Sequence, residues 1–363
     1  MRPTSQVGKT EERPTFATAK LPPEGIRGRP EERQEPSSRT ETNVTVRSVD
    51  GRHPLFRMIQ PDRPNITTVT EIVRVPENDG HKPRGVGTVR GMINRLVLPF
   101  MIKWIAGESL EEAVVVAKGL NEEGSGVMIN CLGEHYKKRK QVEATMGEYV
   151  RMLDPEFCSK ADYVISFKLS QFGLDIDWWY CYENARVMAE KAKKEGKLVW
   201  IDMESSSYTD STLEMYRMLL EAGCDNLGLC LQANLKRTAG DLESLLALNE
   251  EGKFVKIRLC KGAYKEPPEV AYQTKQEIDG NFRRLILRLA ESSEENVLGI
   301  ATHDPEFMEL AKDISKKRKN VEVQMLKGIE ENARRELINQ GVMVITYLPY
   351  GEDAVPYCIR RVR

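Results

Sequence analysis

The sequence predicts an α/β protein of the (β/α)₈ (TIM-type) barrel class with a disordered N-terminal extension. Residues 91–363 contain eight short apolar runs with helical segments between them. These runs are almost continuously apolar, which is typical of parallel strands covered on both faces. A doubly wound open sheet is the main alternative, but eight strand-and-helix units in this length favour a closed barrel.

The extension occupies residues 1–90. It holds 11 of the 18 prolines, no cysteine and only two aromatic residues, Phe16 and Phe56. A segment of this composition cannot bury enough apolar surface to offset the conformational entropy lost on folding. We therefore expect the folded unit to span residues 91–363 and the first 90 residues to be disordered.

Charge and cysteine content exclude several classes of protein. With 54 Lys and Arg against 55 Asp and Glu, the net charge is −1, so no overall basic field favours nucleic acid as a partner. No apolar run approaches the roughly 20 residues of a membrane span, and the first residues lack a signal-peptide core, which predicts a cytoplasmic protein. The seven cysteines form no C-x-x-C pair and the four histidines are scattered, so neither disulfides nor a metal site is expected.

The predicted strands are runs of Val, Ile, Leu, Met and Phe bounded by glycine, proline or charged residues. In chain order they are Val127–Leu132, Tyr163–Leu169, Leu198–Met203, Leu227–Gln232, Phe254–Cys260, Val297–Thr302, Val321–Leu326 and Val342–Leu348.

Helix signals fall between these strands. Ser109 with Glu112, and Ser211 with Glu214, match the capping box, in which a hydroxyl and a carboxylate cap the first helical turn. Asp304-Pro305 offers an N-cap followed by a first-turn proline. The glycines expected just after helix ends are Gly196, Gly223 and Gly341.

Reactive groups of a (β/α)₈ barrel lie at the C-terminal ends of its strands. Lys168 and Arg258 are the most informative, because a cation inside an apolar strand needs an anionic partner or a wet cavity. Asp202 is a candidate for a purely structural ion pair. However, Lys168, Arg258 and Lys261 together would make the C-terminal end of the barrel positively charged, which suits a carboxylate, phosphate or pyrophosphate ligand.

The C-terminal residues could add further side chains to the same end of the barrel. If a helix starts at Gly351–Asp353, then Tyr357 and the pair Arg360 and Arg361 share one helical face that can point back over the strand ends. A solvated arginine pair is the alternative interpretation.

Several longer segments carry a more specific signal. They are Leu96–Phe100, Ala106–Ala113, Phe167–Asp175, Ile201–Ser205, Leu231–Ala233, Arg258–Tyr272, Ala301–Asp304, Val323–Gly328 and Leu348–Asp353, followed by Tyr357 and the pair Arg360–Arg361. Through these segments the chain from about Arg95 onward resembles the monofunctional bacterial-type proline dehydrogenase family. The same catalytic barrel occurs in the bifunctional proline-utilisation flavoproteins.

The resemblance implies a (β/α)₈ barrel that binds FAD and oxidises L-proline to Δ1-pyrroline-5-carboxylate, the first step of proline catabolism to glutamate. A hydride would pass from C5 of proline to N5 of the flavin. The resemblance also implies a quinone as electron acceptor and is compatible with peripheral membrane contact. It does not extend to residues 1–90.

Site roles follow from the resemblance, position by position. Asp202 and Arg258 correspond to residues that flank the reacting centre, with Arg258 near flavin N5. The proposed substrate-binding residues are Lys168, Arg360 and Arg361, which would hold the proline carboxylate, and Tyr350 and Tyr357, which would wall the proline ring. The proposed cofactor-binding residues are Met203, Gln232, Arg258, Lys261, Gly262, Ala263, Thr302 and His303.

Two other functions remain open from the residues alone. Lys168 or Lys261 could act as the Schiff-base nucleophile of an aldolase-like barrel without flavin. A non-catalytic barrel that uses residues 1–90 as an interaction tail is the second alternative. All the strand-end charges are present, which favours an enzyme.

Overall fold

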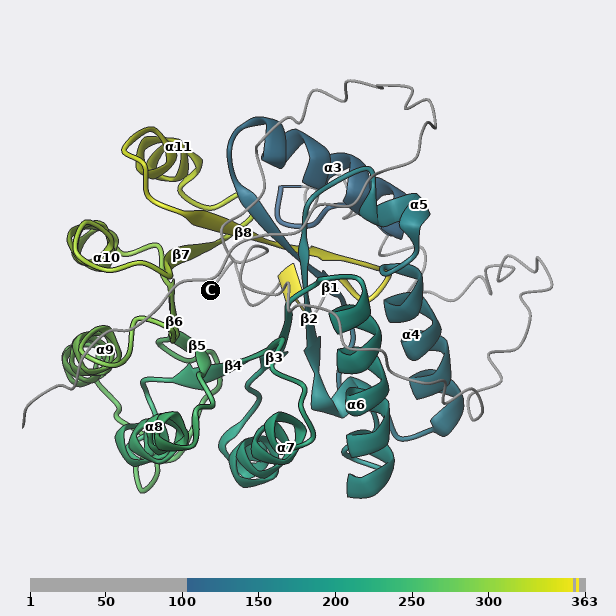
Figure 1. Cartoon of the computed structure of the whole chain (residues 1–363), viewed down its shortest axis with the longest axis horizontal. Coiled ribbons are helices and arrows are strands. Elements are labelled where there is room, and N and C mark those ends of the chain that lie inside the picture. The colour runs from purple at the N-terminus through teal and green to yellow at the C-terminus, as the bar shows by residue number, and fades with distance from the viewer. Residues whose placement is uncertain (1–102, 355–356, 359–363) are drawn as a thin grey trace, which may run out of the picture. The chain divides into compact units, whose positions relative to one another are not determined.

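The computed structural model describes residues 103–354, 357 and 358 of the chain. In this part of the chain eight parallel strands form a closed barrel in which each strand pairs with the next and the last pairs with the first. Helices surround the barrel (Figure 1). The predicted (β/α)₈ class is therefore confirmed. The expected extension over residues 1–90 and its boundary at residue 91 lie outside the described residues.

All eight predicted strands are present. They are β1 (Gly126–Cys131), β2 (Val164–Lys168), β3 (Val199–Asp202), β4 (Leu227–Gln232), β5 (Lys256–Cys260), β6 (Val297–Ala301), β7 (Val321–Leu326) and β8 (Val344–Tyr350). The largest differences from the prediction are at β5 and β8, which begin two residues later than expected. At β8 the reason is a turn: the amide of Val342 donates to the carbonyl of Leu337 and belongs to the preceding helix end.

The α-helices follow the strands around the outside of the barrel. They are α3 (Leu110–Glu122), α4 (Arg139–Arg151), α5 (Pro155–Cys158), α6 (Trp178–Lys194), α7 (Thr209–Glu221), α8 (Thr238–Leu246), α9 (Lys275–Ala290), α10 (Pro305–Ser315) and α11 (Glu331–Asn339). Short 3₁₀ turns are η1 (Leu169–Gln171), η2 (Ser206–Tyr208) and η3 (Ala247–Glu251). No helix within the described residues is both long and apolar enough to cross a membrane.

Two of the predicted N-caps are confirmed. Ser109 and Glu112 form the expected capping box of α3, and Asp304 caps α10 ahead of Pro305. The capping box predicted at Ser211 is wrong, because η2 leads directly into α7 and the helix has already begun at Thr209. Gly196, Gly223 and Gly341 all adopt a positive φ directly after helices, as predicted.

The strands separate two apolar regions. One set of side chains points into the barrel and packs together: Met128, Val164, Leu198, Trp200, Val297 and Ile345. The alternate residues of the same strands, such as Ile129, Val199 and Leu348, pack outward in a cluster shared with the helices. Because strand side chains alternate between two faces, the parity of a residue within its strand decides whether it can reach the barrel interior.

Candidate active site

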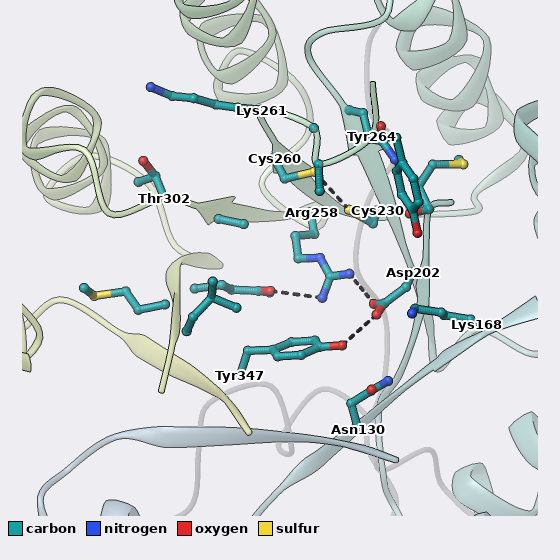
Figure 2. A pocket seen from close by; sticks show the side chains of 18 of the residues that line it. Asn130, Lys168, Asp202, Cys230, Arg258, Cys260, Lys261, Tyr264, Thr302 and Tyr347 are labelled. Carbon is teal, nitrogen blue, oxygen red and sulfur yellow. Dashed lines mark hydrogen bonds and ion pairs between the residues drawn. The ribbon is translucent and has the colours of Figure 1, made fainter. Parts of the chain in front are cut away.

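A cavity of about 270 Å³ opens where the barrel strands end, and all eight strands contribute to its lining (Figure 2). Many of the predicted site residues lie around it. They are Lys168, Asp202, Met203, Gln232, Arg258, Lys261, Gly262, Ala263, Thr302, His303 and Tyr357. Tyr350 does not line this cavity. Arg360 and Arg361 lie outside the described residues.

Asp202 is the centre of a hydrogen-bonded network on the cavity wall. Its Oδ1 accepts from Nη2 of Arg258 and from the hydroxyl of Ser166, and its Oδ2 accepts from the hydroxyl of Tyr347 at 2.8 Å. The side chains of Arg258 and Asp202 are only 7% and 11% exposed. Arg258 therefore has the anionic partner that its place inside an apolar strand requires.

Burial and charge act in opposite directions on this network. Burial opposes the charge on Arg258, but the nearby Cys230 and Asp202 favour it more strongly and keep the pKa of Arg258 well above its usual value. Burial, followed by the charge of Asp202, raises the pKa of Tyr347. Arg258 is therefore a permanent cation at the cavity, and Tyr347 is a neutral hydrogen-bond donor.

Lys168 is the second cation at the cavity, and it has a different partner from the one its position suggested. Its Nζ lies 2.6 Å from Oε2 of Glu134, which belongs to the loop between β1 and α4. The two side chains are 13% and 25% exposed. A partly exposed pair of this kind can exchange one carboxylate for another, because solvent lowers the cost of separating the partners.

The side chain of Lys261 points away from Asp202 (Figure 2). Its Nζ lies 2.6 Å from Oδ1 of Asp279 on α9 and 2.8 Å from Oδ2 of Asp304. Two carboxylates therefore neutralise this lysine. Lys261 joins the cavity lining together with the small residues Gly262 and Ala263.

Unsatisfied acceptors lie beside this glycine segment. Gly262 adopts a φ of +108°, and a Cβ atom there would collide with the side-chain amide of Asn234. Oδ1 of Asn234 and Oε1 of Gln232 are buried and have no hydrogen-bond partner within the described part of the chain. The amide nitrogen of Gln232 is already used, donating to the carbonyls of Met203 and Glu204 at 3.2 and 2.8 Å. Of these two residues Gln232 lines the cavity, so its free oxygen could accept a hydrogen bond from a ligand bound there.

Thr302 and His303 line the cavity after β6. The hydroxyl of Thr302 accepts from the amide of Asp304 at 3.0 Å. Nε2 of His303 accepts from the amide of Leu326 at 2.8 Å, which assigns the ring proton to Nδ1. Both side chains are thus fixed by the loop and by β7 before any ligand binds.

Two tyrosines of β8 lie on opposite faces of the sheet. Tyr347 packs against the inward cluster and lines the cavity, whereas Tyr350 belongs to the outward cluster. The hydroxyl of Tyr350 donates to Oε1 of Glu148 on α4 at 2.8 Å. The sequence analysis assigns the substrate-facing role to Tyr350, but Tyr347, three residues earlier and therefore on the opposite face of β8, is the tyrosine of this strand that lines the cavity.

A pair of cysteines in the cavity lining was also missed. Cys230 of β4 and Cys260 of β5 place their sulfur atoms 3.5 Å apart. The hydrogen bond from the Cys260 thiol, helped by the charge of Arg258, outweighs burial and lowers the pKa of Cys230 to about 6. Within the described residues, no group of histidine, cysteine and acidic side chains is arranged to hold a metal ion.

Comparison with known proteins identifies the family. A family model described as proline dehydrogenase matches residues 113–363. The proline dehydrogenase of Deinococcus radiodurans is 33% identical over 270 residues, which cover 72% of this chain and 84% of that protein. Proline dehydrogenase 2 of Bacillus subtilis (strain 168) is 31% identical over 267 residues, covering 71% of this chain and 84% of the relative.

Solved structures share the fold. Proline utilization A from Bdellovibrio bacteriovorus, inactivated by N-propargylglycine, aligns with a TM-score of 0.69 at 23% identity. The alignment covers 75% of this chain but only 33% of that larger protein. A mutant of the Bradyrhizobium japonicum protein aligns with a TM-score of 0.64 at 20% identity, over 75% of this chain and 31% of that one. From the family model and the sequence relatives, this chain belongs to the proline dehydrogenase family.

Proposed function

We propose that this protein is an FAD-dependent enzyme that oxidises L-proline to Δ1-pyrroline-5-carboxylate, the first step of proline catabolism to glutamate. One observation carries the proposal: Arg258, fixed by Asp202, and Lys168 are two cations on the wall of a single cavity at the strand ends. A cavity with one immobile and one exchangeable cation suits a reaction that binds a carboxylate and builds up negative charge nearby.

The residues around the cavity fit a flavin. The cavity lining includes the small residues Gly262 and Ala263, and the unpartnered side-chain oxygen of Gln232, which also lines the cavity, can accept a hydrogen bond from an N–H group of a flavin. The residues that would hold FAD are Met203, Gln232, Arg258, Lys261, Gly262, Ala263, Thr302 and His303. Bound FAD would supply the two-electron chemistry, with its N5 accepting a hydride from C5 of proline.

The chain's own residues would prepare this chemistry by orientation and charge. Asp202 holds the guanidinium of Arg258 in place, and Tyr347 holds the carboxylate of Asp202. A cation fixed in this way stabilises negative charge that develops beside it without having to reorganise during the reaction. Asp202 and Arg258 are therefore the proposed catalytic residues.

Substrate binding would use the more exposed cation. The proline carboxylate would replace Glu134 as the partner of Lys168, and Tyr347 and Tyr357 would wall the ring. Arg360 and Arg361 would complete the carboxylate clamp, a proposal that rests on the family resemblance. A clamp of this kind fixes the position of C5, which lowers the entropic cost of reaching the reactive geometry.

We also propose a quinone as electron acceptor, reached by peripheral contact of a cytoplasmic enzyme with a membrane. Residues Lys138–Lys140 and Trp179, which is 60% exposed, follow the C-terminal ends of β1 and β2 and so lie on the same rim as the cavity. Basic residues attract anionic headgroups, and tryptophan favours the membrane interface. These features support the membrane contact.

The visible spectrum of the purified protein tests this function. We expect flavin absorbance that bleaches when L-proline is added without oxygen. A colourless protein that cannot take up FAD would contradict the proposal. The aldolase-like alternative is disfavoured because Nζ of Lys168 and Nζ of Lys261 are both held in ion pairs with carboxylates, whereas a Schiff-base lysine must direct its nitrogen at the substrate carbonyl.

A further inference from the structure

A carboxyl group lies inside the barrel next to the catalytic network. Glu322 of β7 is 1% exposed, and its Oε1 accepts from the amide nitrogen of Gln324 at 2.5 Å. Its second oxygen, Oε2, has no hydrogen-bond partner within the described residues. A fully buried carboxyl with one free oxygen is costly, and the proposed function above gives Glu322 no role.

Glu322 and Arg258 face each other across a glycine. The strand register pairs Gly299 of β6 with Arg258 on one side and with Glu322 on the other, so the three residues form one row. A Cβ atom on Gly299 would lie 2.9 Å from Nε2 of Gln324 and 3.4 Å from Cβ of Arg258. The missing side chain leaves the space in which Gln324 reaches between the two charged residues.

Gln324 connects the acid to the arginine. Its Oε1 lies 3.5 Å from Nη1 of Arg258, while its amide nitrogen is bound by Glu322. Because Glu322 needs a donor, it orients the amide with its oxygen toward the guanidinium. In the opposite orientation two donors would face each other at Arg258, and the arginine would lose this contact.

We propose that Glu322 is a positioning residue for Arg258, acting through Gln324, and that the gain or loss of its proton sets the charge around Arg258. This inference rests on the proposed flavin-dependent function, because Arg258 is there assigned to the flavin. It adds a residue that sits below the cavity and does not line it.

Burial has a larger effect on the titration of Glu322 than the surrounding charges have. Burial raises the pKa of Glu322 to about 7, against the smaller effects of the Gln324 hydrogen bond and the charge of Arg258. Within the described part of the chain, the other titratable groups that interact with Arg258 include Asp202 of β3, Tyr347 of β8, Cys230 of β4 and Cys260 of β5. With neutral Glu322, the negative charges beside Arg258 are those of Asp202 and of Cys230 when its thiol is ionised. Ionised Glu322 adds a negative charge beside them.

Infrared spectroscopy of the full-length protein and of Glu322→Gln tests the titration without needing flavin or proline. We expect the wild-type protein to show the carbonyl band of a buried carboxylic acid that disappears as the pH rises through about 7, and Glu322→Gln to lack this band. A wild-type protein without the band, or a variant that keeps it, would overturn the assignment.

The midpoint potential of bound flavin tests the link to Arg258. A negative charge near the ring disfavours added electrons, so the potential of the wild-type holoenzyme should fall more steeply with pH near neutrality than that of Glu322→Gln. If the flavin potential of the two proteins depended on pH in the same way, the link to Arg258 would be overturned. Cys230 is present in both proteins, so its titration cancels in the comparison. If proline failed to bleach the flavin, the proposed function would be contradicted. The infrared titration of Glu322 and the pH dependence of the flavin potential would still be valid tests of this inference.

Positioning is tested by rescue. Glutamine at position 322 still offers an oxygen to Gln324, whereas Glu322→Ala offers none. We expect Glu322→Ala to slow flavin reduction roughly tenfold with little change in KM for proline, and Glu322→Gln to recover most of that loss at acidic pH. If Glu322→Ala does not fold, Gln324→Leu removes the same bridge. A bridge variant that reduces flavin as fast as the wild type would refute the positioning role.

Discussion

The hydroxyl of Tyr347 donates a 2.8 Å hydrogen bond to Oδ2 of Asp202 and so ties the last barrel strand to the third. Tyr347→Phe removes a donor to a charged acceptor, an interaction of about 1.5–3 kcal/mol. We expect kcat/KM for proline to fall by about tenfold to a hundredfold. Steady-state kinetics with a dye or quinone acceptor measures this loss.

Tyr350→Phe is the matched control. Its hydroxyl contacts Glu148 and not the cavity, so the variant should keep the kinetics of the wild type while losing about 1 kcal/mol of unfolding free energy. The opposite pattern, with Tyr350→Phe slow and Tyr347→Phe normal, would show that the faces of β8 are wrongly assigned.

Lys168 is expected to determine substrate affinity. Lys168→Ala, like Arg360→Ala, would remove a proposed partner of the proline carboxylate, so KM should rise by about one to two orders of magnitude while FAD stays bound. Lys137→Ala, which changes an exposed lysine on the same rim, serves as the control and should leave KM unchanged. An unaltered KM in Lys168→Ala would remove this residue from the clamp.

The thiol pair provides a test of where the flavin binds. Cys230 and Cys260 line the cavity, whereas the partly exposed Cys158 lies elsewhere. We expect FAD to slow alkylation of the pair and to leave Cys158 unaffected, as measured by mass spectrometry of the apo and FAD-loaded protein. Equal labelling of the pair in both forms would argue against flavin in this cavity.

Glu322 is expected to make the protein less stable as the pH rises. The pKa of Glu322 is about 7 in the folded protein and 4.5 in the reference state. Between pH 4.5 and about 7, the native protein therefore keeps a proton that the unfolded chain has released. The free energy of unfolding should therefore decrease across this interval, by about 3 kcal/mol from this group. Chemical denaturation at pH 5 and pH 8 should show the decrease in the wild type and a smaller one in Glu322→Gln.

The barrel could be predicted from sequence because its signals are local. Eight runs are apolar at both odd and even positions, which indicates parallel strands that lie between two apolar layers. The C-terminal ends of these runs predict where Lys168, Asp202 and Arg258 lie. The same continuity hides which face of a strand points inward. In β8 both faces are apolar, so the sequence pattern did not separate Tyr347 from Tyr350.

Other site features depended on contacts between strands. Glu322 is a lone charge in an apolar run, the pattern that singled out Lys168, but its importance emerges only when Gly299 is seen to leave room beside Arg258. The cysteine pair likewise depends on the register of β4 against β5. The capping box expected at Ser211 failed because a preceding 3₁₀ turn had already started the helix.

The closing seam of the barrel joins Gly126–Cys131 to Ile345–Tyr350. Asp202 and Arg258 are therefore synthesised well before Tyr347, and the strand that carries Tyr347 is the one that completes the ring. A nascent chain on the ribosome can hold most of the barrel and still lack one of the three side chains that donate to Asp202. The hydrogen bond between Tyr347 and Asp202 therefore forms only when the barrel closes.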